Sequence, residues 1–73
     1  MVDLIEVGPV SGGSEMDKPL MEMRFPAGSF IAAIERKEQV IVPTAREKVQ
    51  EGDRLIIIGR MSFQKDYIKM FVS

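Results

Sequence analysis

Nucleophilic catalysis by this chain would have to use a hydroxyl or an amine, because the chain has no cysteine. A serine nucleophile needs a neighbouring base, and the chain also has no histidine to serve as one. The serines are Ser11, Ser14, Ser29, Ser62 and Ser73. Without an activating partner, these side chains give no reason to expect covalent catalysis.

Paired carboxylates could support acid–base chemistry or bind a hard metal ion. Glu51 and Asp53 flank Gly52, a pattern that favours a turn because glycine adopts positive φ and aspartate bonds to nearby backbone. The other acidic candidates are too scattered to form a calcium or magnesium site: Asp17, Glu22 and Glu47. The missing cysteine and histidine also remove the commonest transition-metal ligands. We therefore predict no catalytic residue, no metal site, no cofactor and no enzymatic activity.

The bulk composition predicts a single domain over residues 1–73. The chain is 45% hydrophobic and 29% charged, which is ordinary for a folded soluble domain. Its net charge is −1 with both signs interspersed, whereas a nucleic-acid binder normally carries a basic excess. No apolar run reaches the ~20 residues of a membrane span, and no basic region precedes an apolar stretch at the N-terminus. We expect a cytoplasmic domain without nucleic-acid binding or direct membrane insertion.

The elements that must position any site begin with a strand over residues 2–7, where apolar and charged side chains share both faces. Residues 8–14 are rich in glycine, proline and serine and predict a flexible connection. A phosphate-cradling loop is the alternative, but the segment matches no complete nucleotide-binding motif.

A short helix is predicted next. Met16, Leu20 and Met23 recur at helical spacing, Pro19 suits the first turn, and Pro26 ends the pattern. The methionines on this stripe predict core packing, with an adaptable ligand groove as the alternative.

Two strands over residues 30–36 and 39–42 form a predicted hairpin, joined at Lys37 and Glu38. These two residues are not the Asn-Gly or Asp-Gly that a type I′ turn favours. A wider loop or a bulge is therefore expected at the turn. Pro43 ends the second strand.

Residues 55–58 are four consecutive aliphatics, which predict a strand covered on both faces. A last helix over residues 62–71 covers one face with its apolar stripe. That stripe consists of Phe63, Tyr67, Met70 and Phe71. So short a chain has little material for the other face, so either the sheet curls on itself or a second subunit supplies the cover. The predicted fold is α+β, a small β-α-β-β-β-α domain with a mainly antiparallel sheet and two short helices.

Four segments, taken in order, resemble the TrkA-C domain, the C-terminal half of the regulator of potassium conductance module. They are KPLMEM at residues 18–23, FPAGSFIAAIER at 25–36, VIVP at 40–43 and VQEGDRLIIIG at 49–59. The family pattern runs approximately Gly-Lys-Pro-Leu-x-x-Leu, an apolar strand ending in arginine, Val-Ile-x-Pro, then Glu-x-Gly-Asp and aliphatics closing in glycine. The likeness covers roughly residues 2–71. Asp17 departs from the family's first glycine, and Lys37-Glu38 departs from its usual Asp-Gly turn.

The resemblance implies a regulatory, usually dimeric domain of a potassium or other cation uptake system or channel. The implied partners are a second copy of the chain, a membrane cation transporter or channel subunit, and a small-molecule effector. The domain would lie in the cytoplasm, peripheral to the inner face of the membrane through the transporter. Relatives that bind cyclic di-AMP carry an arginine where this chain has Pro26, so the resemblance does not carry that ligand over. The chain also lacks the Gly-x-Gly-x-x-Gly of a dinucleotide site.

For a bound effector, we expect a groove at the dimer interface. The residues expected near it are Leu20, Met21, Ile31 and Pro43. The plain alternative is that these four are only core and interface, as apolar residues at such spacing usually are. The alternative function is a pure dimerisation or assembly domain with no small-molecule ligand.

Overall fold

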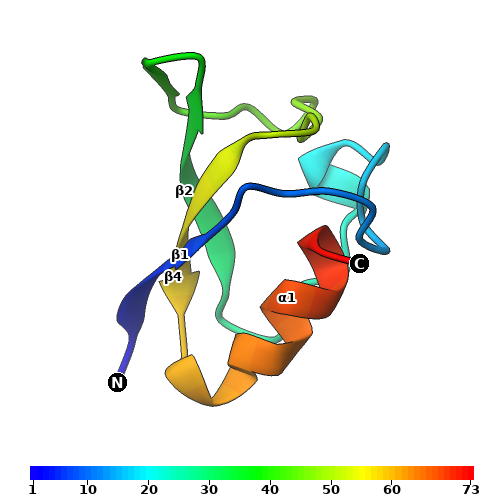
Figure 1. Cartoon of the computed structure of the whole chain (residues 1–73). Coiled ribbons are helices and arrows are strands. Elements are labelled where there is room, and N and C mark those ends of the chain that lie inside the picture. The colour runs from blue at the N-terminus through cyan, green and yellow to red at the C-terminus, as the bar shows by residue number, and fades with distance from the viewer.

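Four strands form one antiparallel sheet, and an α-helix packs against one of its faces (Figure 1). The computed structural model describes residues 1–73. The strands are β1 (Asp3–Val7), β2 (Phe30–Arg36), β3 (Gln39–Ile41) and β4 (Arg54–Gly59), and the helices are the 3₁₀ turns η1 (Leu20–Glu22) and η2 (Met61–Phe63) and the α-helix α1 (Gln64–Phe71). The strand order is β1-β4-β2-β3. A small α+β domain with an antiparallel sheet is thereby confirmed.

The register of β4 with its neighbours β1 and β2 shows which side chains share each face of the sheet. Ile57 lies opposite Ile5 of β1 and Ile31 of β2, and all three side chains are buried. Successive residues of a strand point to opposite faces. The neighbouring row therefore points away from the core, and its members are Leu4, Ile58 and Phe30.

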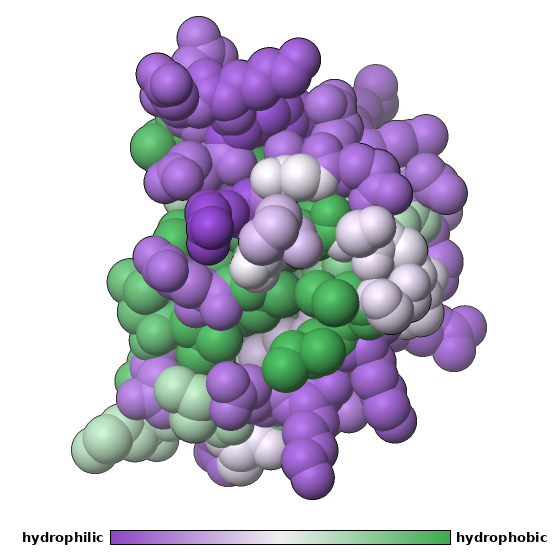
Figure 2. Space-filling model, viewed as in Figure 1, coloured by the Kyte–Doolittle hydropathy of each residue, from purple (hydrophilic) through white to green (hydrophobic).

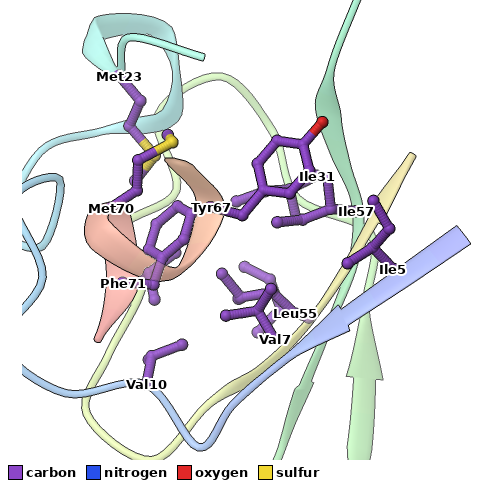
Figure 3. Close-up of a cluster of buried hydrophobic side chains, with 12 residues drawn as sticks. Ile5, Val7, Val10, Met23, Ile31, Leu55, Ile57, Tyr67, Met70 and Phe71 are labelled. Atoms are coloured by element: carbon purple, nitrogen blue, oxygen red, sulfur yellow. The ribbon is translucent and has the colours of Figure 1, made fainter. Parts of the chain in front are cut away.

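The core lies between the inner face of the sheet and α1 (Figure 3). Tyr67 and Phe71 of α1 and Leu55 and Ile57 of β4 are all fully buried. The predicted last helix and its apolar stripe are confirmed, with its first turn formed as η2. With eight residues, α1 falls far short of a membrane span, and none of the helices could serve as one.

The first of the two predicted helices is reduced to the single 3₁₀ turn η1. Met23 is already extended, with φ −75° and ψ 145°. The backbone N–H groups of Leu20 and Met21 donate to the carbonyls of Glu47 and Ala45 at 2.9 and 3.0 Å. These hydrogen bonds to a distant segment satisfy the backbone in place of helical ones, and prolines on both sides leave little room for a longer helix. The tertiary contacts therefore override the helical spacing.

The core role predicted for the methionine stripe is confirmed without the helix. Met23 is buried, and Met16 and Leu20 pack half-buried against the same apolar cluster. An extended segment that folds back over the core can bury such residues as well as a helix does.

The hairpin between β2 and β3 is confirmed, but the wider loop expected at its turn is not present. Arg36 pairs with Gln39, so only Lys37 and Glu38 form the turn, with φ of 48° and 65°. Positive φ at both central positions is what a type I′ turn requires, even though neither residue is one that favours it. The irregularity lies inside β2 instead, where the register with β4 shifts near Ala33.

Candidate functional site

Three of the four predicted groove residues lie near the junction of η1 with the segment 44–48. Met21 is 63% exposed, whereas Leu20 and Pro43 are half-buried. Two backbone hydrogen bonds tie η1 to the segment 44–48, which begins directly after Pro43. Ile31 belongs to the core cluster, with 6% of its surface exposed. The structure therefore brings Leu20 and Met21 to one surface with this segment. The side chain of Ile31 points to the inner face of the sheet, in the core.

A buried ion pair fixes the segment 44–48 to the sheet. Nε and Nη2 of Arg36, at the end of β2, donate to the two carboxylate oxygens of Asp53 at 3.0 and 2.8 Å. Nη2 also donates to the carbonyl of Lys48 at 3.1 Å, and Nη1 lies 3.6 Å from the carboxylate of Glu47. Asp53 is 1% exposed and accepts a further hydrogen bond from the backbone N–H of Gln50 at 2.9 Å. We refer to Arg36, Asp53 and the segment 44–48 together as the Arg36–Asp53 clamp.

The Arg36–Asp53 clamp positions backbone and does not transfer protons. The hydrogen bonds to Asp53 raise the pKa of Arg36 above its already high ordinary value, with burial opposing them. The guanidinium therefore stays charged, and its forked geometry matches the carboxylate. The pattern Glu51-Gly52-Asp53 predicts a turn, which Gly52 with φ +88° confirms, but this local pattern does not predict the bond from Arg36 to Asp53. The available signal was the family pattern, which ends a strand in arginine and places aspartate after Glu-x-Gly.

A second buried carboxylate, Glu15, joins the chain that enters η1 to the chain that leaves it. Glu15 is 5% exposed and accepts hydrogen bonds from Lys18 Nζ at 2.8 Å and from the backbone N–H of Arg24 at 2.6 Å. The bond from Lys18, followed by the bond from Arg24, lowers the pKa of Glu15. Nothing in the sequence pattern singles out this residue, because Arg24, whose backbone N–H donates to it, becomes its neighbour only once η1 has formed.

The surface has hollows beside Lys48 and beside α1. One of about 420 Å³ lies between Gly12, Met16 and the segment 48–51, and another of about 430 Å³ lies between Arg24 and α1. None of the hollows is lined by the predicted groove residues Leu20, Met21, Ile31 or Pro43. No group of three or more potential metal-ligating side chains converges.

The outer face of the sheet, opposite α1, is apolar and uncovered. Leu4 is 62% and Phe30 54% exposed, on either side of Ile58, and Val40 of β3 is 70% exposed. Figure 2 shows apolar surface along the left margin, where this face lies in the view of Figure 1. The sequence predicts that both faces of β4 are covered. In the structure α1 covers the inner face, whereas Ile56 and Ile58 remain half-buried on the outer face.

Comparison with known proteins identifies the family. The model of the TrkA-C domain matches residues 12–69. Two relatives from Methanosarcina mazei, named Trk system potassium uptake protein TrkA homolog 1 and homolog 2, are 30% and 29% identical to this chain over 69 residues. These alignments cover 94% of this chain, but the chain spans only 15% of the length of each relative. The matched region holds η1, Arg36 and Asp53, and this chain belongs to the TrkA-C domain family.

Proposed function

We propose that this chain is a ligand-sensing and dimerisation domain of a potassium or other cation uptake system or channel. It acts in the cytoplasm as a homodimer, attached to the inner face of the membrane through a transporter or channel subunit. The family match over residues 12–69 carries the proposal, and the names of the two relatives, both Trk potassium uptake proteins, support the transported ion. The role is regulatory rather than catalytic.

The Arg36–Asp53 clamp provides a physical route for regulation. A ligand shifts a conformational equilibrium only by binding two states with different affinity. A ligand at the surface formed by Leu20, Met21 and Pro43 would contact η1 and the chain that leads into the segment 44–48. Arg36 connects that segment to β2, so a change at the surface would be passed to the sheet. Ile31 would take part from the core rather than by touching the ligand.

The second candidate is an assembly domain that dimerises and binds no small molecule. The hollows of the single chain favour it, because none of them is lined by the predicted groove residues. In this case Leu20, Met21 and Pro43 serve only as core and interface.

A thermal-shift screen distinguishes the two candidates. The probes are potassium, sodium, divalent cations and a panel of nucleotides, tested on the wild type, on Met21→Glu and on the control Lys65→Glu in the exposed part of α1. Ligand sensing predicts that one probe raises the Tm of the wild type and of Lys65→Glu by several degrees, but not that of Met21→Glu. The absence of a shift with every probe would contradict ligand sensing and leave the assembly domain.

The transport role is tested in cells. A strain that lacks the coding sequence should take up rubidium, a tracer for potassium, more slowly at low external potassium than the complemented strain. Equal uptake by the two strains would contradict a role in potassium uptake, whatever the thermal-shift screen finds.

A further inference from the structure

We infer that two copies of this chain pair through the outer faces of their sheets, with Leu4, Phe30 and Ile58 at the centre of the interface. The inference rests on the homodimer of the proposed function and adds the surface at which the copies meet. That surface lies on the opposite side of the sheet from α1 and is separate from the hollows between loops.

The outer face carries apolar side chains of the kind that form a protein core, but no second layer of structure covers them. Leu4, Ile58 and Phe30 form one row across three strands, and the next row places Ile56 beside Ala33. Of the six residues in these two rows only Glu6, opposite Ile56, is charged, and β3 adds an exposed valine at its edge. On the inner face, rows of the same type are covered by α1. An antiparallel sheet that faces water on one side normally alternates apolar and polar residues, and β4 does not.

The exposed area suits a two-fold pairing. Leu4, Phe30 and Val40 are 62%, 54% and 70% exposed, so the apolar side chains on this face expose on the order of 400 Å², within the range for the largest patch on a typical monomer. Two such faces in contact would remove about 800 Å² of apolar surface from water, and the charged residues at the border would add to this toward the ~1,200 Å² of a standard specific interface. A chain of 73 residues buries too little surface alone for a wide stability margin, so this additional burial supports the fold as well.

The charges around the face allow it to pair with itself. A two-fold interface sets the same patch against its own copy, so a border of one sign would repel. Here Glu6 of β1 ends the second row, opposite Ile56, and Glu35 of β2 lies directly opposite Arg54 of β4. Because the border carries both signs, the glutamates of one copy can face the arginine of the other. These features favour a second copy of the chain over a partner of strong single charge.

The first test measures the mass of the full chain in solution by light scattering over a dilution series. The wild type and the control Ile68→Glu, on the exposed side of α1, should both have twice the 8.2 kDa mass of the single chain. Phe30→Glu should have the mass of one chain, because a buried glutamate at the centre of the interface would lack a partner. Circular dichroism checks that Phe30→Glu keeps the fold, which is expected because Phe30 is 54% exposed in the single chain.

The second test does not depend on a charged substitution. The chain has no cysteine, so Ile58→Cys and the control Ile68→Cys each introduce a single thiol. A short bifunctional thiol crosslinker should join two copies of Ile58→Cys, which would face each other across the interface. It should leave Ile68→Cys as a single chain on a denaturing gel.

The outcomes separate this inference from the proposed function. A wild-type dimer that persists in Phe30→Glu, with no crosslinking at position 58, would overturn the sheet-to-sheet interface and leave the homodimer standing. A wild type that is monomeric at every concentration would overturn both the homodimer and this interface, while the ligand screen and the uptake measurement would still test the regulatory role. Loss of the dimer in Phe30→Glu together with crosslinking at position 58 establishes the interface.

Discussion

Leu55 and Ile57 point toward α1 and are fully buried, whereas Ile56 and Ile58, on the other face of the same strand, remain half-buried. All four residues are aliphatic, so residue type does not explain the difference. The chain places a helix over one face and nothing over the other. The sequence of an apolar strand thus indicates that both of its faces favour burial, whereas the rest of the chain determines which faces are buried.

The same contrast holds for charged residues at one end of the sheet. Arg36 points to the covered side, where the buried carboxylate of Asp53 neutralises it and fixes its geometry. Glu35, one residue earlier, lies opposite Arg54 on the outer face, and both side chains are exposed. Buried charges need fixed partners, whereas water can solvate exposed ones. Substitutions on the two sides should therefore have unequal effects.

The largest difference is expected between Ile57→Ala and Ile58→Ala. Ile57→Ala should lower the free energy of unfolding by about 2–5 kcal/mol, because it opens a cavity beneath α1. In dilute protein, Ile58→Ala should lower it by no more than about 1 kcal/mol. At high protein concentration this smaller loss should increase, since the proposed dimer would bury Ile58 further. Urea denaturation at two protein concentrations measures both values, and equal losses in dilute protein would contradict the distinction between the faces.

Asp53→Asn should have the next largest effect. It leaves the partly buried guanidinium of Arg36 without its counter-charge, which we expect to lower the free energy of unfolding by about 3 kcal/mol. The matched control Glu35→Gln, on the outer face, should change it by no more than about 0.5 kcal/mol. In Asp53→Asn the amides of Leu20 and Met21 should also exchange hydrogen faster, because the segment that accepts their hydrogen bonds is released. Unchanged protection of these amides would show that the Arg36–Asp53 clamp does not hold η1.

Glu15→Gln should have a smaller effect than Asp53→Asn at neutral pH, about 1 kcal/mol. Glu15 belongs to the covered side, since its backbone N–H donates to the carbonyl of Met70 in α1 at 2.9 Å. Hydrogen bonds from Lys18 and then Arg24 lower the pKa of Glu15 in the folded chain. The stabilisation from this carboxylate is therefore fully present above its ordinary pKa of 4.5 and is lost as the pH falls through the lower folded value.

Urea denaturation over an acidic pH series tests this dependence. The wild type should lose more stability on acidification than Glu15→Gln does. Glu6→Gln, which removes one exposed carboxylate from the outer face, is the control for the change in net charge. An equally steep loss in wild type and Glu15→Gln would exclude the hydrogen bonds of Glu15 as its source.

The strands and the last helix could be predicted because neighbours in the sequence determine them. Ile5 and Val7 lie two residues apart in β1, so they share one face, and both are buried. Tyr67, Met70 and Phe71 recur at helical spacing and fill the space above β4. In each case, the element buries the apolar side that its own spacing defines.

The first predicted helix and the candidate site depend on contacts between distant residues. The N–H groups of Leu20 and Met21 in η1 donate to carbonyls more than 20 residues away, and a local pattern does not contain these bonds. The Arg36–Asp53 pair likewise joins two elements that only the folded sheet brings together. Ile31 is predicted to lie near the groove, and only the register of β2 with β4 assigns its side chain to the core. Sequence periodicity thus predicts elements well and their mutual contacts poorly.

The position of β1 at the edge of the sheet also affects when the domain can fold. β1 opens the chain, yet its neighbour in the sheet is β4, with Asp3 opposite Gly59. The carbonyl of Ser11 likewise accepts a hydrogen bond from the N–H of Ser73, at the other end of the chain. During synthesis the first strand must therefore remain unpaired until nearly the whole domain has left the ribosome. Pairing between such distant segments also slows folding, so the native state forms as a late and all-or-none event.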